Sequence, residues 1–427
     1  MLASSHYALS GGTSTLSLAS RHDATTKWCA DTPPTMTTEE FIMAHRTDDV
    51  RRLALQGNRY PDIDMPFALD QIAGWQTART KLPSWVAVDG IVYPPHLSME
   101  QCSSEQTARY KARLAERLTG GKGEMLIDLT GGFGVDFSFM ARVFSRSIYV
   151  ERQEKLCETV RHNLPLLGLS HAEVVCDDGI GVLHTIEHAS VIFLDPARRN
   201  ANGGKTIAIS DCTPDVTTVL DELTQKADHV IVKLSPLLDW HKAVADLRGK
   251  VSVGNECKEL LLVLSDKGKD NVKVFCVNDS YVFEYESKSH STLHTSHTST
   301  IAHHPTHLFE PNASIMKAGC FTELAERYSM KPVSMNSHLF VSDTDVPEFP
   351  GRRFVIDAIT TMNRKILATA LKGIDHANIT VRNFPLSVAE LRKRIKLKDG
   401  GDTYIFATTL GSREHVLIIC HKILYNI

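Results

Sequence analysis

A glycine-rich turn at residues 125–136, MLIDLTGGFGVD, limits the possible folds of this chain more than any other feature. A short apolar run ends on Asp128, three glycines follow within six residues, and a helical pattern begins near Val135. Glycines let a ligand approach the backbone closely, and N–H groups at the start of a helix can bind a carboxylate. The segment therefore predicts a strand, a site for a nucleotide-like cofactor and a helix, in that order.

Strand and helix patterns alternate after this turn, as in an open α/β sheet. Further strands are predicted at residues 147–150, 172–176, 191–194, 229–234, 260–264 and 272–277. The first three of these end on acids, namely Glu151, the pair Asp177 and Asp178, and Asp195. Ligands of open α/β sheets bind outside the carboxyl ends of the strands. We therefore expect these acids to surround one ligand.

The glycine spacing separates two classes of cofactor site. A dinucleotide-binding turn reads Gly-x-Gly-x-x-Gly, but counting from Gly132 places Phe137 where the third glycine should be. A dehydrogenase is therefore disfavoured. The acid, the two-residue gap and the glycine turn instead resemble the first motif of class I S-adenosylmethionine-dependent methyltransferases, which implies a Rossmann-like sheet and S-adenosylmethionine (SAM) as the cofactor.

The same resemblance implies a set of cofactor-binding residues. The methionine and ribose part of the cofactor would be surrounded by Asp128, Thr130, Gly131, Gly132 and Gly134. Glu151 would hold the two ribose hydroxyls, and Asp178, in preference to Asp177, would lie beside the adenine amino group. A carboxylate only accepts hydrogen bonds, which suits a diol or an amino group. The alternative is that these acids are ordinary strand-end residues in solvated loops.

The segment LDPARR at residues 194–199 resembles the substrate-facing motif of such enzymes. It departs from the Asp-Pro-Pro-aromatic form of amino-group methyltransferases, because Ala197 replaces the second proline and Arg198 the aromatic residue. The Asp-Pro-x-Arg form is closer to uracil carbon-5 methyltransferases, but those place a nucleophilic cysteine where this chain has KLSP at residues 233–236. Direct methyl transfer is therefore expected, with Cys212 left open as a thiol of another kind.

Three residues of this motif are the candidates for catalysis and substrate binding. We expect Asp195 to bind the amino-donor end of the substrate or cofactor, and Arg198 or Arg199 to hold a phosphate or carboxylate. The alternative for the arginine pair is a surface salt bridge. The polar segment NANGGK at residues 200–205 is typical of a mobile loop over a substrate.

Length and composition favour a cytoplasmic enzyme of roughly three domains. The nine cysteines of the 427 residues occur singly, without a Cys-x-x-Cys pair, and no secretory signal is apparent. No apolar run approaches the roughly 18 residues that span a bilayer, so we expect no membrane partner. We interpret residues 1–36 as disordered or as a non-native extension before a natural start at Met36.

Residues 37–120 are predicted to form a mostly helical domain before a methyltransferase domain at 121–285. A capping box at Thr37 and Glu40 opens the first helix, and Asp89-Gly90 predicts a hairpin within residues 86–93. Ser103 is expected to cap a helix that runs through Leu118. Gln101 and Ser103 could face the cofactor cleft, although a structural role is favoured.

The segment at residues 286–308 is rich in His, Ser and Thr and carries six histidines between positions 287 and 307. Histidine-rich tracts can bind metal. This one has neither a fixed ligand spacing nor neighbouring acids, so a flexible linker is favoured and no metal is expected.

The C-terminal residues 351–427 differ in charge from the rest of the chain. They carry 13 Lys and Arg against 6 Asp and Glu, a local charge of +7 in a chain whose net charge is −3. A basic domain joined to an acidic catalytic part favours a polyanionic substrate. The elements expected here are strands at 354–359, 378–383, 404–408 and 416–420 and helices at 363–371 and 388–397.

The second of these helices is the most basic segment. Ser387 and Glu390 form a capping box, and the predicted buried stripe is Val388, Leu391 and Ile395. The remaining surface carries Arg392, Lys393, Arg394, Lys396 and Lys398. The first four of these residues are candidates for binding the substrate, and a solvated helix face is the alternative.

Four segments together give a more specific resemblance. IDLTGGFGVD, LDPARR, FEPNA at residues 309–313 and VRNFPLSVAELRKRIKLKDGGDTYIFATTL at 381–410 resemble a bacterial family of class I methyltransferases with a ferredoxin-like module, here 309–350, and a C-terminal THUMP-like domain, here 351–427. The resemblance implies an RNA methyltransferase acting on tRNA or rRNA. The alternatives are a methyltransferase for a protein or small molecule, and a non-catalytic RNA-binding protein that retains the fold.

Overall fold

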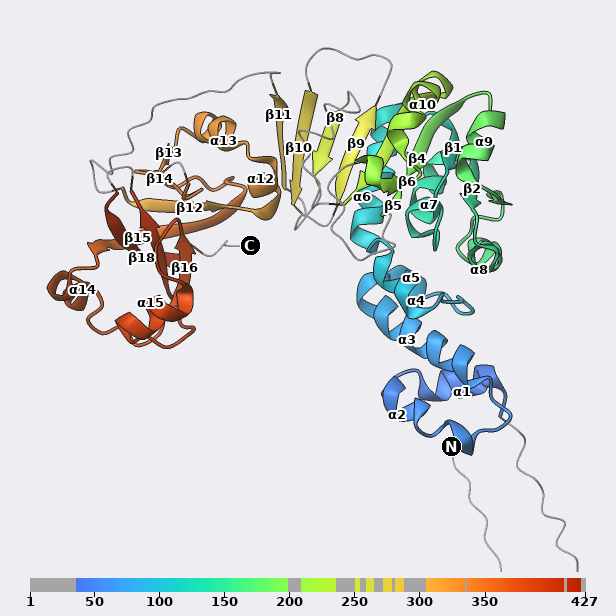
Figure 1. Cartoon of the computed structure of the whole chain (residues 1–427), viewed down its shortest axis with the longest axis horizontal. Coiled ribbons are helices and arrows are strands. Elements are labelled where there is room, and N and C mark those ends of the chain that lie inside the picture. Colours follow the sequence, from blue (N-terminus) through green and yellow to red (C-terminus); the bar gives the residue numbers. More distant parts are fainter. Residues whose placement is uncertain are drawn as a thin grey trace, which may run out of the picture.

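The computed structural model describes residues 36–198, 209–235, 250–253, 259–264, 272–278, 281–287, 305–334, 336–410 and 413–423. These residues form an arch in Figure 1. A large sheet lies at the top, the N-terminal helices form one arm, and the C-terminal sheet forms the other. The fold is mixed α/β.

The large sheet has nine strands in the order β11-β10-β8-β9-β7-β4-β1-β2-β3. Its strands are β1 (Gly123–Asp128), β2 (Phe144–Glu151), β3 (Glu173–Cys176), β4 (Ala189–Leu194), β7 (Ala227–Leu234), β8 (Lys250–Val253), β9 (Leu260–Leu264), β10 (Val272–Asn278) and β11 (Tyr281–Ser287). The strands from β7 to β3 are parallel, whereas β9 runs antiparallel to β7. All seven strands expected from the sequence are present, and the sequence interpretation missed β8 and β11.

Both faces of this sheet are apolar, because alternate residues of each central strand enter different cores. Leu126 of β1 and Phe193 of β4 pack on one face with Leu114. Ile127 and Ile192 pack on the other. The first face is covered by α6 (Glu105–Thr119), α7 (Val135–Met140) and α8 (Glu154–Leu166), and the second by α9 (Gly179–Thr185) and α10 (Leu220–Lys226). This is the Rossmann-like arrangement expected from the sequence.

The N-terminal arm consists of α1 (Thr38–His45), α2 (Val50–Ala54), α3 (Met65–Lys81), α4 (Pro83–Val86) and α5 (His96–Gln101). The capping box at Thr37 and Glu40 is confirmed. The cap expected at Ser103 is wrong by one residue, because the Ser104 hydroxyl accepts the hydrogen bond from the Thr107 N–H at 3.3 Å. Ser103 is thereby free for a different role.

The hairpin expected at residues 86–93 is also wrong. No strand forms there, although Gly90 does adopt a left-handed conformation with φ of 83°. Side chains replace the second strand: the amides of Asn163 and Gln71 each pair with both the N–H and the C=O of one residue, at 2.8–2.9 Å. Asn163 pairs with Val92, and Gln71 pairs with Tyr93. The backbone groups of these two residues are therefore hydrogen-bonded without a second strand.

The C-terminal sheet has seven strands in the order β13-β14-β12-β15-β18-β17-β16. They are β12 (His307–Pro311), β13 (Lys331–Pro332), β14 (Phe340–Ser342), β15 (Gly351–Thr361), β16 (Asn378–Arg382), β17 (Thr403–Thr409) and β18 (His415–Lys422). The sequence divides this region into 309–350 and 351–427, yet β12 pairs antiparallel with β15, so both parts contribute to a single sheet. Buried Glu310 of β12 accepts from Arg352 at 2.6 Å and from Arg382 at 3.0 Å, which ties the two parts together.

Two pairs of helices cover the C-terminal sheet and join it to the large one. They are α12 (Ala313–Ala318) with α13 (Phe321–Tyr328), and α14 (Arg364–Ala370) with α15 (Val388–Ile395). Ile315 and Leu324 of the first pair enter the same core as Val274 of β10, so the two sheets share one continuous core. In α15 the capping box is confirmed and Leu391 is buried, but Val388 is 38% exposed and does not belong to the buried stripe.

Candidate active site

The glycine turn after β1 is held tightly against β2. A Cβ on Gly131 would lie 2.1 Å from Cε2 of the Tyr149 ring, so only glycine fits at this position. The Tyr149 hydroxyl donates a hydrogen bond to the carbonyl of Gly132. Gly134 has a φ of 78°, the left-handed conformation that glycine adopts without strain, and α7 begins directly after it. The turn is therefore a rigid support for whatever binds above it.

Glu151, the last residue of β2, reaches this turn. One carboxylate oxygen accepts from the Gly132 N–H at 3.0 Å and the other from the Gln153 N–H at 2.9 Å. The side chain is nearly buried and therefore fixed in position. Because each carboxylate oxygen can accept more than one hydrogen bond, both remain able to accept from a diol.

Asp128 lies beneath the same turn and is 1% exposed. One of its oxygens accepts from the Thr130 N–H at 3.0 Å. Burial raises the pKa of Asp128 well above its usual value, and the nearby carboxyls of Asp136, Asp195 and Glu151 raise it further, against the effect of the Thr130 N–H. A cation bound beside Asp128 would favour its ionised form. The amino group and the sulfonium of SAM are such cations, so Asp128 fits this cofactor.

Asp177 and Asp178 follow β3 and are both exposed. The backbone N–H of Asp177 donates to the carbonyl of Glu151 at 3.1 Å, which places this loop beside the end of β2. Asp178 caps α9, with one oxygen accepting from the N–H groups of Ile180 and Gly181 at 3.1 and 3.0 Å. Its role beside an adenine amino group stays a prediction.

Asp195 follows β4 and connects the cofactor turn to the expected substrate side. Its backbone N–H donates to the Thr130 hydroxyl at 2.5 Å, and one carboxylate oxygen accepts from the Lys233 ammonium at 2.7 Å. The Asp195 side chain is 39% exposed. Thr130 thus links the LDPARR segment directly to the glycine turn.

Behind Asp195 lies a polar network that the sequence interpretation missed. Its members are Ser103, Lys111, Asp136, Lys233 and Glu259, and all are buried or nearly so. The Lys111 ammonium lies 3.0 Å from Asp136 and also contacts Glu259. The Ser103 hydroxyl donates to Asp136 at 2.7 Å and lies 3.0 Å from both Glu259 and Lys233.

One signal for this network was present in the sequence. Lys111 lies on the buried face of α6 with Ala108, Leu114 and Ala115, and lysine is almost never fully buried without a partner. Its position predicts an ion pair, but nothing in the pattern identifies Glu259, 148 residues away, as the partner.

Of the two arginines of the LDPARR segment, Arg198 lies within the described residues. Ala197–Arg198 forms the short strand β5, which pairs antiparallel with β6 (Cys212–Thr213). Arg199 and the predicted loop at residues 200–205 lie outside the described residues, as do most of the histidine-rich tract and Pro236. Cys212 is buried in this pairing at 2% exposure.

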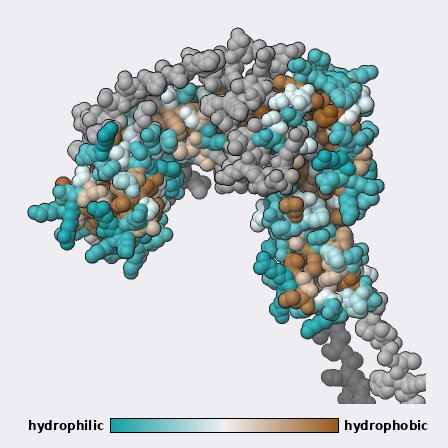
Figure 2. Space-filling model, in the orientation of Figure 1, coloured by the Kyte–Doolittle hydropathy of each residue, from teal (hydrophilic) through white to brown (hydrophobic). Residues whose placement is uncertain are grey.

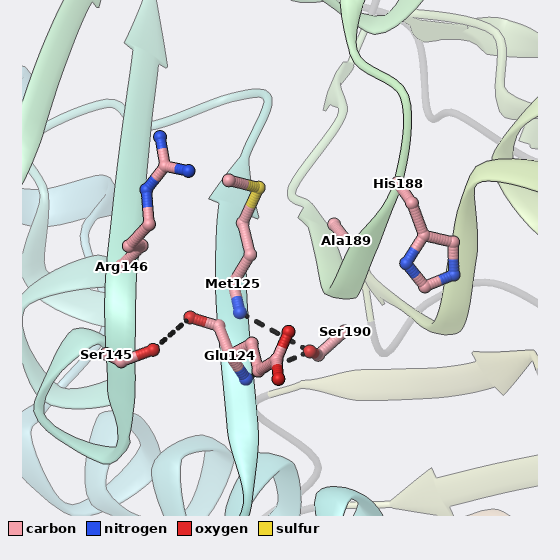
Figure 3. Close-up of a pocket in the computed structure, with 7 residues that line it drawn as sticks. All are labelled: Glu124, Met125, Ser145, Arg146, His188, Ala189 and Ser190. Atoms are coloured by element: carbon pink, nitrogen blue, oxygen red, sulfur yellow. Dashed lines mark hydrogen bonds between the residues drawn. The ribbon is translucent and has the colours of Figure 1, made fainter.

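A pocket of about 370 Å³ lies at the opposite edge of the sheet. Figure 3 shows Glu124 and Met125 of β1, Ser145 and Arg146 of β2 and the residues around Ala189 of β4 lining it. These residues stand near the starts of parallel strands, whereas ligands of such sheets bind at the carboxyl ends. The pocket is therefore separate from the cluster of acids.

In the described part of the chain, no helix is both long enough and apolar enough to cross a membrane. Within the same residues, no three His, Cys, Asp or Glu side chains are grouped as metal ligands.

Comparison with known proteins shows the family to which the chain belongs. The crystal structure of a putative methyltransferase from Porphyromonas gingivalis W83 is 30% identical, with a TM-score of 0.77, and the match covers 90% of this chain and 97% of that one. The chain belongs to this methyltransferase family. Family models for a ferredoxin-like domain and a THUMP domain-like region match residues 307–350 and 351–422 of this methyltransferase.

Curated relatives support the same cofactor. An uncharacterised SAM-dependent methyltransferase of Mycobacterium tuberculosis is 22% identical over 332 residues, which is 75% of this chain and 86% of the relative. A putative rRNA methyltransferase of Bacillus subtilis is 37% identical over 82 residues, 18% of this chain and 44% of the relative. The cofactor of this methyltransferase is SAM, which supplies an electrophilic methyl group on a sulfonium.

Replacing Glu151 by alanine tests the cofactor site. We expect SAM affinity to fall roughly 10- to 100-fold, because hydrogen bonds to a charged group contribute about 1.5–3 kcal/mol. Isothermal titration calorimetry and the SAM-dependent rise in melting temperature measure the change. Glu158→Ala, on the exposed side of α8, is the matched control and should bind as the wild type does. Unchanged affinity in Glu151→Ala would contradict the assignment.

Proposed function

We propose that this methyltransferase modifies RNA, either tRNA or rRNA, and that its C-terminal module binds the substrate. The observation that carries the proposal is the exposed basic surface of α15 on a protein whose catalytic unit binds SAM. The name of the Bacillus subtilis relative, which includes rRNA, is consistent with it.

The basic surface of α15 consists of three positively charged side chains, two within the helix and one directly after it. Lys393, Arg394 and Lys396 are exposed, and none of the residues that the structure describes forms an ion pair with them. Arg392, which we also expected to bind substrate, contacts other residues of the C-terminal module. Its guanidinium lies 2.5 Å from the Asp399 carboxylate and donates a hydrogen bond to the carbonyl of Ala377 at 3.0 Å. We therefore remove Arg392 from the proposed RNA contacts.

The surroundings of α15 suit a polyanion. Arg364 and Lys365 at the start of α14 are exposed too, and both helices pack on the same face of the C-terminal sheet through Leu367 and Leu391. Hydrophilic residues cover much of this arm in Figure 2. Lysine and arginine on one exposed face bind phosphates without regard to sequence, so we assign this module to substrate affinity rather than to chemistry.

The chemistry is assigned to the carboxyl ends of β1, β2 and β4. Methyl transfer forms a bond between the nucleophile and the methyl carbon while the bond from that carbon to sulfur breaks. A nucleophile that is an amine or hydroxyl must also lose a proton. Asp195 is partly exposed, is tied to the glycine turn through Thr130, and is the residue that we propose to bind this donor and accept the proton.

Modified nucleosides identify the substrate. RNA from cells with and without the gene, compared by mass spectrometry, should differ in at least one methylated nucleoside. RNA from the deletion strain should then accept labelled methyl groups from SAM and purified protein. Label that survives ribonuclease would point instead to a protein or small-molecule substrate.

Neutralising the α15 cations tests the substrate-binding surface. For the triple variant Lys393→Ala, Arg394→Ala and Lys396→Ala, we expect weaker RNA binding and a salt dependence of log Kd reduced by roughly 2 to 3. Filter binding at several salt concentrations measures both, and SAM affinity should stay unchanged. Alanine at Arg51, Arg52 and Arg59, which are exposed on the N-terminal arm, is the matched control. Equal losses in the two triple variants would refute a specific role for α15.

A further inference from the structure

We propose that Lys233 is a positioning residue that holds Asp195 as an ionised acceptor facing the substrate, and that α6 and the segment before it complete this arrangement through Lys111 and Ser103. The inference rests on the methyl transfer proposed above and narrows its substrate. The reacting group of the substrate must carry an N–H or an O–H.

Lys233 is fixed by every hydrogen bond that it can donate. It is the residue before the last in β7, and its ammonium contacts Asp195 at 2.7 Å, Ser103 at 3.0 Å and Asp136 at 3.5 Å. Glu259, directly before antiparallel β9, lies 3.9 Å from the Lys233 ammonium. An ammonium has three N–H donors, so these three contacts leave Lys233 without freedom to rotate away.

The charges around Asp195 come from four elements and the segment before β9. Carboxyls lie on β1 and α7 and before β9, and ammonium groups on α6 and β7. The residues are Asp128, Asp136, Glu259, Lys111 and Lys233. Burial, and to a lesser extent the Asp136 carboxylate, raise the pKa of Asp195 above its ordinary value, and Lys233, the cation in contact with it, acts against them. Without Lys233, no described residue would form an ion pair with the Asp195 carboxyl.

Lys233 acts as a fixed charge and not as a proton acceptor. Burial opposes its ammonium form, but Asp195, Asp136 and Glu259 outweigh burial and raise the pKa of Lys233 above its usual value. It therefore stays protonated over the whole working pH range. Any proton that leaves the substrate must go to Asp195 or to water.

Asp195 is the point at which this network opens to solvent. Its side chain is 39% exposed, whereas those of Lys111, Asp136, Lys233 and Glu259 are 0–11% exposed. Lys233 binds Oδ2, and no described residue donates to Oδ1. An ionised carboxylate oxygen that faces outward accepts hydrogen bonds and offers none. It can orient an amine or a hydroxyl, but it cannot donate to a nucleophile that lacks hydrogen.

Helix α6 and the segment before it contribute the residues that bind the buried acids of the network. Ser103 precedes α6 and Lys111 lies within it, and between them they contact Asp136, Glu259 and Lys233. These contacts keep Asp136 and Glu259 from competing with Asp195 for Lys233. Helix α6 and the segment before it are thus part of the catalytic unit.

Lys233→Met is the decisive variant, with Lys233→Arg and Lys226→Met beside it. Lys226 is a lysine that pairs with Glu222 at 2.9 Å at the end of α10, away from the network, and so controls for loss of an ion pair. The probe is labelled SAM added to a whole extract of the deletion strain. Because label is counted in RNA, protein and small-molecule fractions, the result does not depend on which fraction contains the substrate.

In Lys233→Met, Asp195 should ionise only at higher pH, so the acid limb of the pH–rate profile should move up by about one unit or more. Lys233→Arg should restore most of the shift, Lys226→Met should show none, and all variants should bind SAM as the wild type does. A merely structural role of Lys233 would lower the rate equally at every pH.

The outcomes separate this inference from the RNA proposal. Label in a ribonuclease-resistant fraction, with the limb still shifted in Lys233→Met, rejects RNA and supports Lys233. Label in RNA, with an acid limb that is not shifted in Lys233→Met, supports RNA as the substrate and rejects the role of Lys233. If wild-type protein that binds SAM labels no fraction, both proposals are overturned. A methylated product whose acceptor atom carried no hydrogen before transfer would also refute the inference.

Discussion

Replacing Asp195 by alanine is expected to lower the rate of methyl transfer by about 100- to 10,000-fold, the usual contribution of a positioned proton acceptor. SAM affinity should change little, because Asp195 meets the cofactor turn through its backbone N–H, which alanine keeps. The loss should therefore appear in kcat at saturating SAM. Single-turnover transfer of labelled methyl groups to RNA from the deletion strain measures it.

Two further variants make the Asp195 test specific. Asp195→Asn keeps the shape and one acceptor oxygen but cannot take a proton, so its rate should lie between those of wild type and alanine. Asp228→Ala is the matched control, because Asp228 is an exposed acid at the opposite end of β7. A full rate in Asp195→Ala would show that the LDPARR acid has no chemical role.

The part of the site that could be predicted from the sequence follows from the parallel strands. Their carboxyl ends meet at one edge of the sheet, so the acids that end the strand patterns come together there. Asp128, Glu151 and Asp195 do lie around one glycine turn, linked by Gly132 and Thr130. What these residues bind and catalyse stays a prediction, to be tested by the variants above.

The buried network could not be predicted, because it depends on pairings that local patterns do not encode. Glu259 directly precedes β9, which runs antiparallel to β7, so the beginning of this strand lies beside the end of β7. A rule about strand ends therefore misses it. Ser103 precedes a helix cap at Ser104, and only packing of α6 on α7 shows that its hydroxyl points inward. The wrongly predicted hairpin near Val92 has a similar cause, since Asn163, whose side chain replaces the second strand, lies 71 residues away.

The second prediction concerns the fully buried ammonium of Lys111. Lys111→Met should lower the free energy of unfolding of the catalytic unit by about 3–5 kcal/mol, because Asp136 and Glu259 would lose a partner and stay buried. Urea unfolding followed by tryptophan fluorescence suits this measurement. Trp85 is buried against Phe133 of the glycine turn, with ring centroids 5.1 Å apart.

A double variant distinguishes charge from packing as the cause. Lys111→Met with Glu259→Met removes both partners of one pair, so it should regain at least half of the loss. Lys122→Met, an exposed lysine just beyond α6, should unfold as the wild type does. If the double variant is less stable than Lys111→Met, the loss comes from packing and not from an unpaired carboxylate.

The effect of pH provides an independent test of the same variant. Burial works against ionisation of Asp136, but Lys111 and Lys233 outweigh it and hold the pKa of Asp136 below its ordinary value. A carboxyl whose pKa is lowered by folding contributes stability above its unfolded pKa of about 3.9, and this contribution is lost as the pH falls through the folded value. The difference between wild type and Lys111→Met should therefore be largest near neutral pH and should narrow as the pH falls below about 4. A difference that stays constant from neutral to acidic pH would show that Lys111 stabilises the fold through its methylene groups, and α6 would then have no electrostatic link to the site.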